Sequence, residues 1–124
     1  MNGSYMTKFI THHLDAYIRY LHLAREHSHV PYLEKFDAIE RAQFEAIMLA
    51  WGDGKPLAVS EAMRVDHLGS TSTQHKRLVR LRQMELIVDQ YQSDDRRTKF
   101  LVPSEKGLKY ASQVGRMLLK SMDD

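Results

Sequence analysis

The sequence contains no cysteine. Disulfide bonds, thiolate metal ligands and thiol-based redox switches are therefore excluded. No apolar run approaches the roughly 18 residues that a membrane-spanning helix needs, and the first residues lack the apolar stretch of a signal peptide. With three prolines and 27% charged residues, the composition is that of an ordinary globular protein. We expect a cytoplasmic protein with no membrane partner.

The 124 residues suffice for one domain with a modest core of its own. The formal net charge of +2 conceals an uneven distribution. Between Arg64 and Arg82 the chain carries five basic residues and a single acidic one, Asp66. A basic stripe on a nearly neutral chain fits a surface that contacts phosphates, and it also fits a solvated helix face.

Apolar spacing predicts a helix at each end of the chain, over about residues 7–27 and 104–122. The stripe of the first consists of Ile10, Leu14, Tyr17 and Leu21. The second carries a heptad-like seam of Leu108, Ala111, Gly115, Leu118 and Met122. Both seams lie outside the central elements, so they bury either within one chain or, as we expect, in a homodimer.

A third helix is predicted from the N-cap candidate Asp37 to Trp51. Its apolar residues fall on two edges, so we expect it to be buried on much of its circumference. The glycines of the segment 52–54 end it.

Two further helices follow at helix-turn-helix spacing. Ser60 is the N-cap candidate of a short helix over residues 61–66, and Gly69 allows the chain to reverse at positive φ. Ser70 or Thr71 then caps a helix that runs to about residue 84. Its inward stripe is expected to be Thr71, Gln74, Leu78 and Leu81.

A hairpin is predicted directly after this helix pair. Residues 86–88 and 100–102 are apolar and rich in β-branched side chains, which favours two strands. The polar segment 93–97 between them contains Arg96 and Arg97. Helix, turn, helix and basic hairpin together delimit a DNA-binding lobe over about residues 56–103.

Four segments taken together are similar to a known family. They are residues 39–47, 60–81, 84–87, and 95–99 with 104–107. In this order and spacing they resemble the MarR family of bacterial winged-helix regulators. The resemblance implies a mainly α (α+β) winged helix-turn-helix domain over residues 1–124, whose terminal helices form a dimerisation region. The chain departs from the family pattern at three positions. The family usually has Gly at the position of Glu85, frequently a basic residue at the position of Asp89, and usually Leu at the position of Pro103.

The resemblance also implies double-stranded DNA as the partner. The residues expected to contact DNA are Ser72, Thr73, Lys76, Arg77, Arg80, Arg96, Arg97 and Lys99. Ser72, Thr73 and Lys76, in the first half of the helix that runs to about residue 84, would read base edges in the major groove. Arg77 and Arg80, further along this helix, would contact phosphates. An arginine of the hairpin would enter the minor groove, with Asp95 pairing the other. The expected function is a transcriptional regulator, most often a repressor, acting as a homodimer on a palindromic operator.

Two other classes of function stay open. A winged helix that binds an acidic protein partner instead of DNA would use the same basic helix. An enzyme would need an acid/base pair or a nucleophile held in a pocket. The adjacent carboxylates, Asp94-Asp95 and Asp123-Asp124, fall at a hairpin tip and a chain end. We therefore expect no catalytic residue.

The sequence gives little indication of a small ligand. Members of the resembled family often release DNA when a small aromatic acid binds, and Tyr17, Tyr32 and Trp51 are candidates for lining such a pocket or, alternatively, for the core. No cofactor is expected. Among the seven histidines, His22, His27 and His29 suggest zinc, but no acidic residue completes a tetrahedral set, so no metal site is expected.

Overall fold

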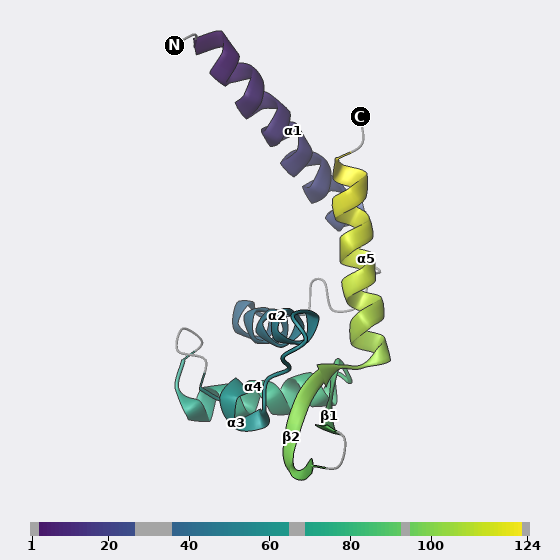
Figure 1. The fold of residues 1–124 in the computed structure, drawn as a ribbon. Coiled ribbons are helices and arrows are strands. Elements are labelled where there is room, and N and C mark those ends of the chain that lie inside the picture. The colour runs from purple at the N-terminus through teal and green to yellow at the C-terminus, as the bar shows by residue number, and fades with distance from the viewer. Residues whose placement is uncertain (1–2, 27–35, 65–68, 93–94, 123–124) are drawn as a thin grey trace. The chain divides into compact units, whose positions relative to one another are not determined.

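The computed structural model describes residues 3–26, 36–64, 69–92 and 95–122 (Figure 1). Its elements are α1 (Gly3–Glu26), α2 (Ala38–Gly52), α3 (Val59–Ala62), α4 (Thr71–Gln83), β1 (Ile87–Gln92), β2 (Asp95–Pro103) and α5 (Glu105–Ser121). The described part is mainly helical with one two-stranded antiparallel sheet, which agrees with the α+β class expected from the sequence.

The chain divides into two compact units. The terminal unit comprises Met1–Glu34 and Tyr110–Asp124, and the central unit comprises Lys35–Lys109. The central unit takes in α2 in addition to the lobe predicted over 56–103, because α2 packs against α4 and β2.

The core of the central unit is formed by α2, α4 and the base of the hairpin. Its fully buried apolar side chains are Ile47, Leu78, Leu81, Leu86 and Leu101. Burial of each such side chain contributes about 1.5–3 kcal/mol. The prediction that Gln74, Leu78 and Leu81 face inward is confirmed. The prediction for Thr71 is wrong: it is the first residue of α4, beside the cap Ser70, and it is exposed.

Helix α2 begins as predicted and is less buried than predicted. The Asp37 side chain accepts the Glu40 N–H at 2.7 Å, which confirms the N-cap. Ile47 is fully buried, and Phe44 packs against Phe36 with ring centroids 5.9 Å apart. The outer face stays exposed, as Trp51 shows at 39% exposure. Burial on much of the circumference was therefore wrong, because α4 and β2 cover only one side of the helix.

Helix α3 starts earlier than predicted. Its N-cap is Ala58 and not Ser60, and the Ala58 N–H donates to the Glu61 carboxylate at 2.9 Å. Ala58 also bridges Phe100 of β2, which fixes extended backbone just before the helix. The helix also ends earlier than predicted, at Ala62 with Met63 as its C-cap, so the predicted continuation through residues 63 and 64 is wrong. Residues 65 and 66 of the predicted span lie outside the described residues. Gly69 has φ +103, as predicted for the turn.

The hairpin is longer than predicted. Strands β1 and β2 pair from Ile87↔Pro103 to Gln92↔Asp95, with an irregularity after Tyr91. Arg96 and Arg97 therefore lie in β2 and not in a loop. The strands extend beyond the apolar residues from which they were predicted. Residues 93 and 94 of the predicted tip lie outside the described residues. At the other edge of β2, the Leu101 N–H donates to the Leu57 carbonyl at 2.8 Å.

The junction between α4 and β1 is a Schellman turn with a non-glycine residue at its centre. Glu85 adopts φ 62, the left-handed conformation that glycine ordinarily supplies. The Leu86 N–H donates to the Leu81 carbonyl at 3.1 Å, and the Glu85 N–H donates to the Arg82 carbonyl at 2.9 Å. Leu81 and Leu86 are both fully buried, so the hydrophobic contact typical of the motif holds this conformation.

Ser104 and Gly107 join the hairpin to α5. The Ser104 hydroxyl accepts the Gly107 N–H at 2.9 Å and donates to the Glu85 carbonyl at 2.5 Å. A Cβ at Gly107 would overlap the Leu86 carbonyl oxygen and touch the Phe44 ring at 3.4 Å. Glycine is therefore required here by close backbone approach, which gives a physical reason for the Ser-Glu-Lys-Gly segment noted in the sequence.

The terminal unit joins α1 to the end of α5. The Arg19 Nε donates to the Ser121 carbonyl at 2.8 Å. The large apolar residues of the two predicted seams are each at least 39% exposed: Ile10, Leu14, Tyr17, Leu21, Leu108, Leu118 and Met122. None of the helices described is both long enough and apolar enough to cross a membrane.

Candidate nucleic-acid interface

The exposed face of α4 presents hydroxyl and basic groups. Ser72, Lys76 and Arg80 follow one another at a spacing of four residues, and all three are exposed. Because this spacing keeps side chains on one side of a helix, they form a single line opposite the buried stripe. The sequence prediction that these side chains face away from the core is confirmed.

Thr73 has a structural task that the sequence did not reveal. The Ser70 hydroxyl accepts the Thr73 N–H at 3.2 Å and donates to the Thr73 hydroxyl at 3.0 Å. Ser70 is thus the N-cap, and Thr73 is half-buried beside it. The Thr73 hydroxyl stabilises the start of α4, so of the two hydroxyl residues predicted to read bases only Ser72 lies on the exposed line.

Arg77 is paired with carboxylates of α2. Its Nη1 lies 2.6 Å from Asp37 Oδ2 and 3.6 Å from Glu40 Oε1, and its side chain is only 28% exposed. The predicted phosphate contact stays a prediction, and the structure gives this residue a second role as a clamp between two helices. Sequence reasoning missed the pair because Asp37 and Arg77 are 40 positions apart.

Arg80 shares the same acidic cluster and is more open to solvent. Its Nε lies 3.4 Å from Glu40 Oε1, and 55% of its side chain is exposed. Arg77, by contrast, is only 28% exposed, so the Arg80 side chain is the more accessible of the two. Arg80 therefore suits a phosphate contact better than Arg77 does.

Ionisation within the acidic cluster is uneven. Burial raises the pKa of Glu40, and hydrogen bonding and repulsion from Asp37 raise it further, while Arg80 and Arg77 oppose the change only in part. For Asp37, burial opposes ionisation, but hydrogen bonds from Glu40 and the charge of Arg77 outweigh it and lower the pKa. Of the two carboxylates, Asp37 is therefore the harder to protonate and Glu40 the easier.

A polar relay ties α2 to the start of α4. The Gln43 side-chain amide donates to the Gln74 carbonyl at 3.1 Å, and the Gln74 amide donates to the Gly69 carbonyl at 2.9 Å. Both glutamines are almost completely buried. Together with the ion pairs, these hydrogen bonds hold α4 against α2. Helix α2 therefore sets the orientation of the exposed line of Ser72, Lys76 and Arg80.

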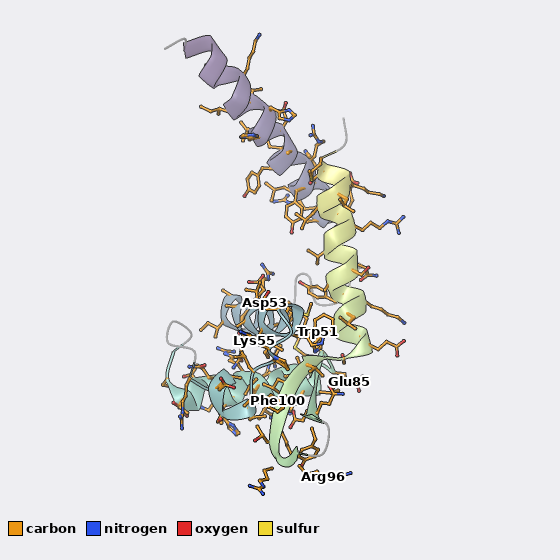
Figure 2. The ribbon with its side chains drawn as sticks, in the orientation of Figure 1. Trp51, Asp53, Lys55, Glu85, Arg96 and Phe100 are labelled. Atoms are coloured by element: carbon orange, nitrogen blue, oxygen red, sulfur yellow. The ribbon has the colours of Figure 1, made fainter. Side chains whose placement is uncertain are left out.

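The hairpin carries the second group of basic residues. Arg96 lies at the far end of the hairpin (Figure 2), and Arg96 and Arg97 are both exposed. Lys99 faces Tyr91 across the strands, with its Nζ 6.0 Å from the ring centroid, a geometry that favours a cation–π contact. The predicted pairing of Asp95 falls on a side chain outside the described residues.

Asp89 is compensated within the fold. Both of its carboxylate oxygens accept from Arg82, at 3.1 and 3.2 Å. This bidentate pair joins α4 to β1 and cancels the acidic charge that marks a departure from the family pattern. Arg82 is therefore committed to orienting the hairpin relative to α4.

The residues weighed for an effector pocket and for zinc are only partly described. Tyr17 lies in the terminal unit and Trp51 in the central unit, and both are exposed. Tyr32, His27 and His29 lie outside the described residues. In the described part of the chain, no three His, Cys, Asp or Glu side chains cluster as metal ligands would.

An open groove of about 580 Å³ does occur beside the hairpin base. It is lined by Arg82, Glu85, Ile87, Val88, Ser104, Glu105, Lys106 and Lys109. None of these side chains is aromatic, so the groove does not include Tyr17, Tyr32 or Trp51, the candidates considered for an effector pocket.

The chain was compared with protein-family models, with curated proteins and with solved structures. None of the three comparisons returned a significant match.

Proposed function

We propose that this protein is a sequence-specific double-stranded DNA-binding transcriptional regulator with a winged-helix lobe, acting as a homodimer. The observation that carries the proposal is the exposed line of Ser72, Lys76 and Arg80 on α4, in the same compact unit as a hairpin bearing Arg96 and Arg97. A major groove about 12 Å wide admits one α-helix, and side chains on its outer face reach base edges and phosphates.

The arrangement of the central unit supports a winged helix. A short helix and a longer one follow each other across a glycine turn, and the hairpin comes directly after the longer helix. The bridge between Ala58 and Phe100 adds extended chain to the edge of the hairpin. Glu85 keeps the turn geometry that the resembled family achieves with glycine, so this departure leaves the hairpin in place.

The basic residues then divide by role. Lys76 is placed to donate to guanine O6 and N7 in the major groove, and Ser72 approaches the bases or their phosphates. Arg80 suits a phosphate contact. An arginine at the hairpin end would insert into the minor groove, where narrow A·T tracts concentrate negative potential.

Dimerisation would complete the terminal unit. The exposed apolar seams of α1 and α5 are of the kind that bury in an interface between chains. A two-fold dimer would present two copies of α4 to half-sites about 10 bp apart, which makes the operator a palindrome.

The testing experiment selects binding sites from a randomised duplex pool at two salt concentrations. Enrichment of a palindrome with half-sites about one helical turn apart is the expected result. Salt-sensitive retention without enrichment would leave a non-specific DNA binder. Absence of retention even at low salt would overturn DNA binding and favour an acidic protein partner for α4.

Two variants then separate positioning from base reading. Arg97→Ala should weaken binding to every duplex, whereas Lys76→Ala should also relax base preference at one position of each half-site, by about 1–3 kcal/mol of discrimination. Lys120→Ala, near the end of α5, is the matched removal of a positive charge outside the central unit and should leave both properties unchanged. Unchanged affinity in the first two variants would contradict this docking.

A further inference from the structure

Glu40 is the one acidic side chain of α2 that is almost completely buried, with only 3% of its side chain exposed. It lies between the core and the basic face of α4, where its Oε1 contacts both Arg77 and Arg80. Burial of an ionised carboxylate is costly unless its oxygens are fully paired. Among the described residues, the other oxygen, Oε2, is buried with no hydrogen-bond partner.

The charges around Glu40 balance closely. Asp37 at the start of α2 adds a second carboxylate, and Arg77 and Arg80 on α4 supply two positive charges. Of the other elements packed against α2, α3 brings Glu61, whose carboxylate accepts the Ala58 N–H. Strand β2 carries its charged residues within 95–99, toward the hairpin end. The cluster at the α2–α4 contact therefore has no net charge while Glu40 is ionised.

A DNA phosphate would change this balance. The Arg80 side chain is 55% exposed. If a phosphate approaches it from solvent, the guanidinium lies between two anions, the phosphate on the solvent side and Glu40 on the core side. A second negative charge at that range disfavours the ionised carboxylate. Protonation relieves this repulsion, removes the cost of burying an ionised carboxylate and makes the net charge of the face that binds DNA more positive by one.

We propose that Glu40 takes up a proton when α4 binds duplex DNA, so that DNA affinity rises as the pH falls. The inference rests on the proposed function and specifies how the same surface is regulated. Glu40 does not touch DNA in this scheme; it is a positioning residue that acts through Arg80 and Arg77. Its raised pKa in the free protein places the effect above the ordinary titration range of a glutamate.

The sign follows from linkage. A group that binds its proton more tightly in the complex than in the free protein makes binding stronger as the pH falls through the interval between its two pKa values. Glu40→Gln keeps the size of the side chain and an oxygen that can accept from Arg80, and it cannot ionise. It therefore fixes the neutral form at every pH.

The experiment measures affinity for one labelled duplex by fluorescence anisotropy, from about pH 8 to about pH 5.5 at constant ionic strength. The duplex is the selected operator or, failing enrichment, a mixed sequence. The wild-type protein should tighten by about threefold to tenfold more than Glu40→Gln, the effect of a single proton. At about pH 8 the variant should bind more tightly than wild type, with a salt slope steeper by about one.

Glu45→Gln is the matched control, because Glu45 is an exposed glutamate on the same helix. It should keep the pH dependence of the wild type. His75 on α4 is present in all three proteins, so its contribution to affinity cancels in the comparison. Parallel pH curves for wild type and Glu40→Gln would overturn the inference while leaving DNA binding intact.

A measurement without DNA keeps the two proposals distinguishable. The free energy of unfolding of the wild type, relative to Glu40→Gln, should rise as the pH falls through the raised pKa of Glu40 toward its unfolded value, because the folded chain binds this proton more tightly. If this difference appears but no protein binds any duplex, the proposed function has failed together with the linkage to DNA, and the buried glutamate is structural only.

Discussion

The two units of this chain differ in how their helical apolar stripes are covered. In the central unit, Ile47, Leu78 and Leu101 are completely buried, and ion pairs join α2 to α4 and α4 to β1. In the terminal unit, Met117 is buried, but Leu14 and Leu118 are about half exposed although they occupy regular positions on long helices. The central unit is complete as a single chain, whereas the terminal unit has apolar surface of the kind that associates with another copy.

Identical leucine truncations test this contrast most strongly. Leu81→Ala should lower the free energy of unfolding by about 3 kcal/mol, because it leaves a cavity in the core of the central unit. Leu118→Ala should change it by less than about 0.5 kcal/mol at protein concentrations low enough to keep the chain monomeric. Chemical denaturation of both variants gives the comparison. Equal losses would mean that the terminal seam is buried within one chain.

Charged substitutions in the apolar seams of α1 and α5 test whether these seams form the interface of a dimer. Leu14→Glu combined with Leu118→Glu should raise the dissociation constant of the dimer by about 100-fold or more, since a buried, unpaired carboxylate costs several kcal/mol. Analytical ultracentrifugation measures the constant. Leu49→Glu is the control, at a leucine of α2 in the central unit that is more exposed than Leu14 and Leu118. Dissociation by the control as well would move the interface away from α1 and α5.

The two glycines of α5 separate the units within one helix. Gly107→Ala should destabilise the central unit by about 2 kcal/mol, because the new methyl group meets the Leu86 carbonyl oxygen. Gly115, in the terminal unit, has no atom within 4 Å of a built Cβ, so Gly115→Ala should stabilise the helix by about 0.5–1 kcal/mol. Thermal unfolding reads both effects. A destabilising Gly115→Ala variant would indicate that a second chain packs closely there.

The smallest expected effect concerns the strained turn of the central unit. Glu85→Gly should raise the free energy of unfolding by about 0.5 kcal/mol, because relief of the left-handed conformation slightly exceeds the added freedom of the unfolded chain. Glu45→Gly, in the exposed middle of α2, should lower it by about 1 kcal/mol. Denaturant titrations distinguish the two signs. Destabilisation by Glu85→Gly would show that the Glu85 side chain contributes more than its distant contact with Lys106 suggests.

Local chemistry made the elements and their caps predictable. Asp37 caps α2 as expected, and Ser70, one of two candidates, caps α4. Gly69 turns at positive φ, and the inward stripe of α4 is buried at Gln74, Leu78 and Leu81. The prediction from the sequence was wrong where one residue, Ala58, contributes to both α3 and the sheet. Ala58 replaced Ser60 as a cap because its backbone is held extended beside Phe100, a contact with a residue 42 positions later.

The candidate site was only half visible in the sequence. The exposure of Lys76 and Arg80 follows from helical spacing, and the basic stripe is read directly from the chain. The carboxylates that share Arg77 and Arg80 are not, because Asp37 and Glu40 look like ordinary capping and first-turn residues of another helix. Only the packing of α2 on α4 brings the two charges of each pair together.

The sequence by itself determined the helices, the hairpin, the basic face of α4 and the apolar seams, since each depends on side chains a few residues apart. The tertiary structure decided which of those charged and apolar groups have partners. It assigned Arg77 to a clamp, left Arg80 half exposed above a buried Glu40, and left the seams of α1 and α5 open. Such partners come from distant parts of the chain, and their desolvation depends on the packing around them, which no local pattern contains.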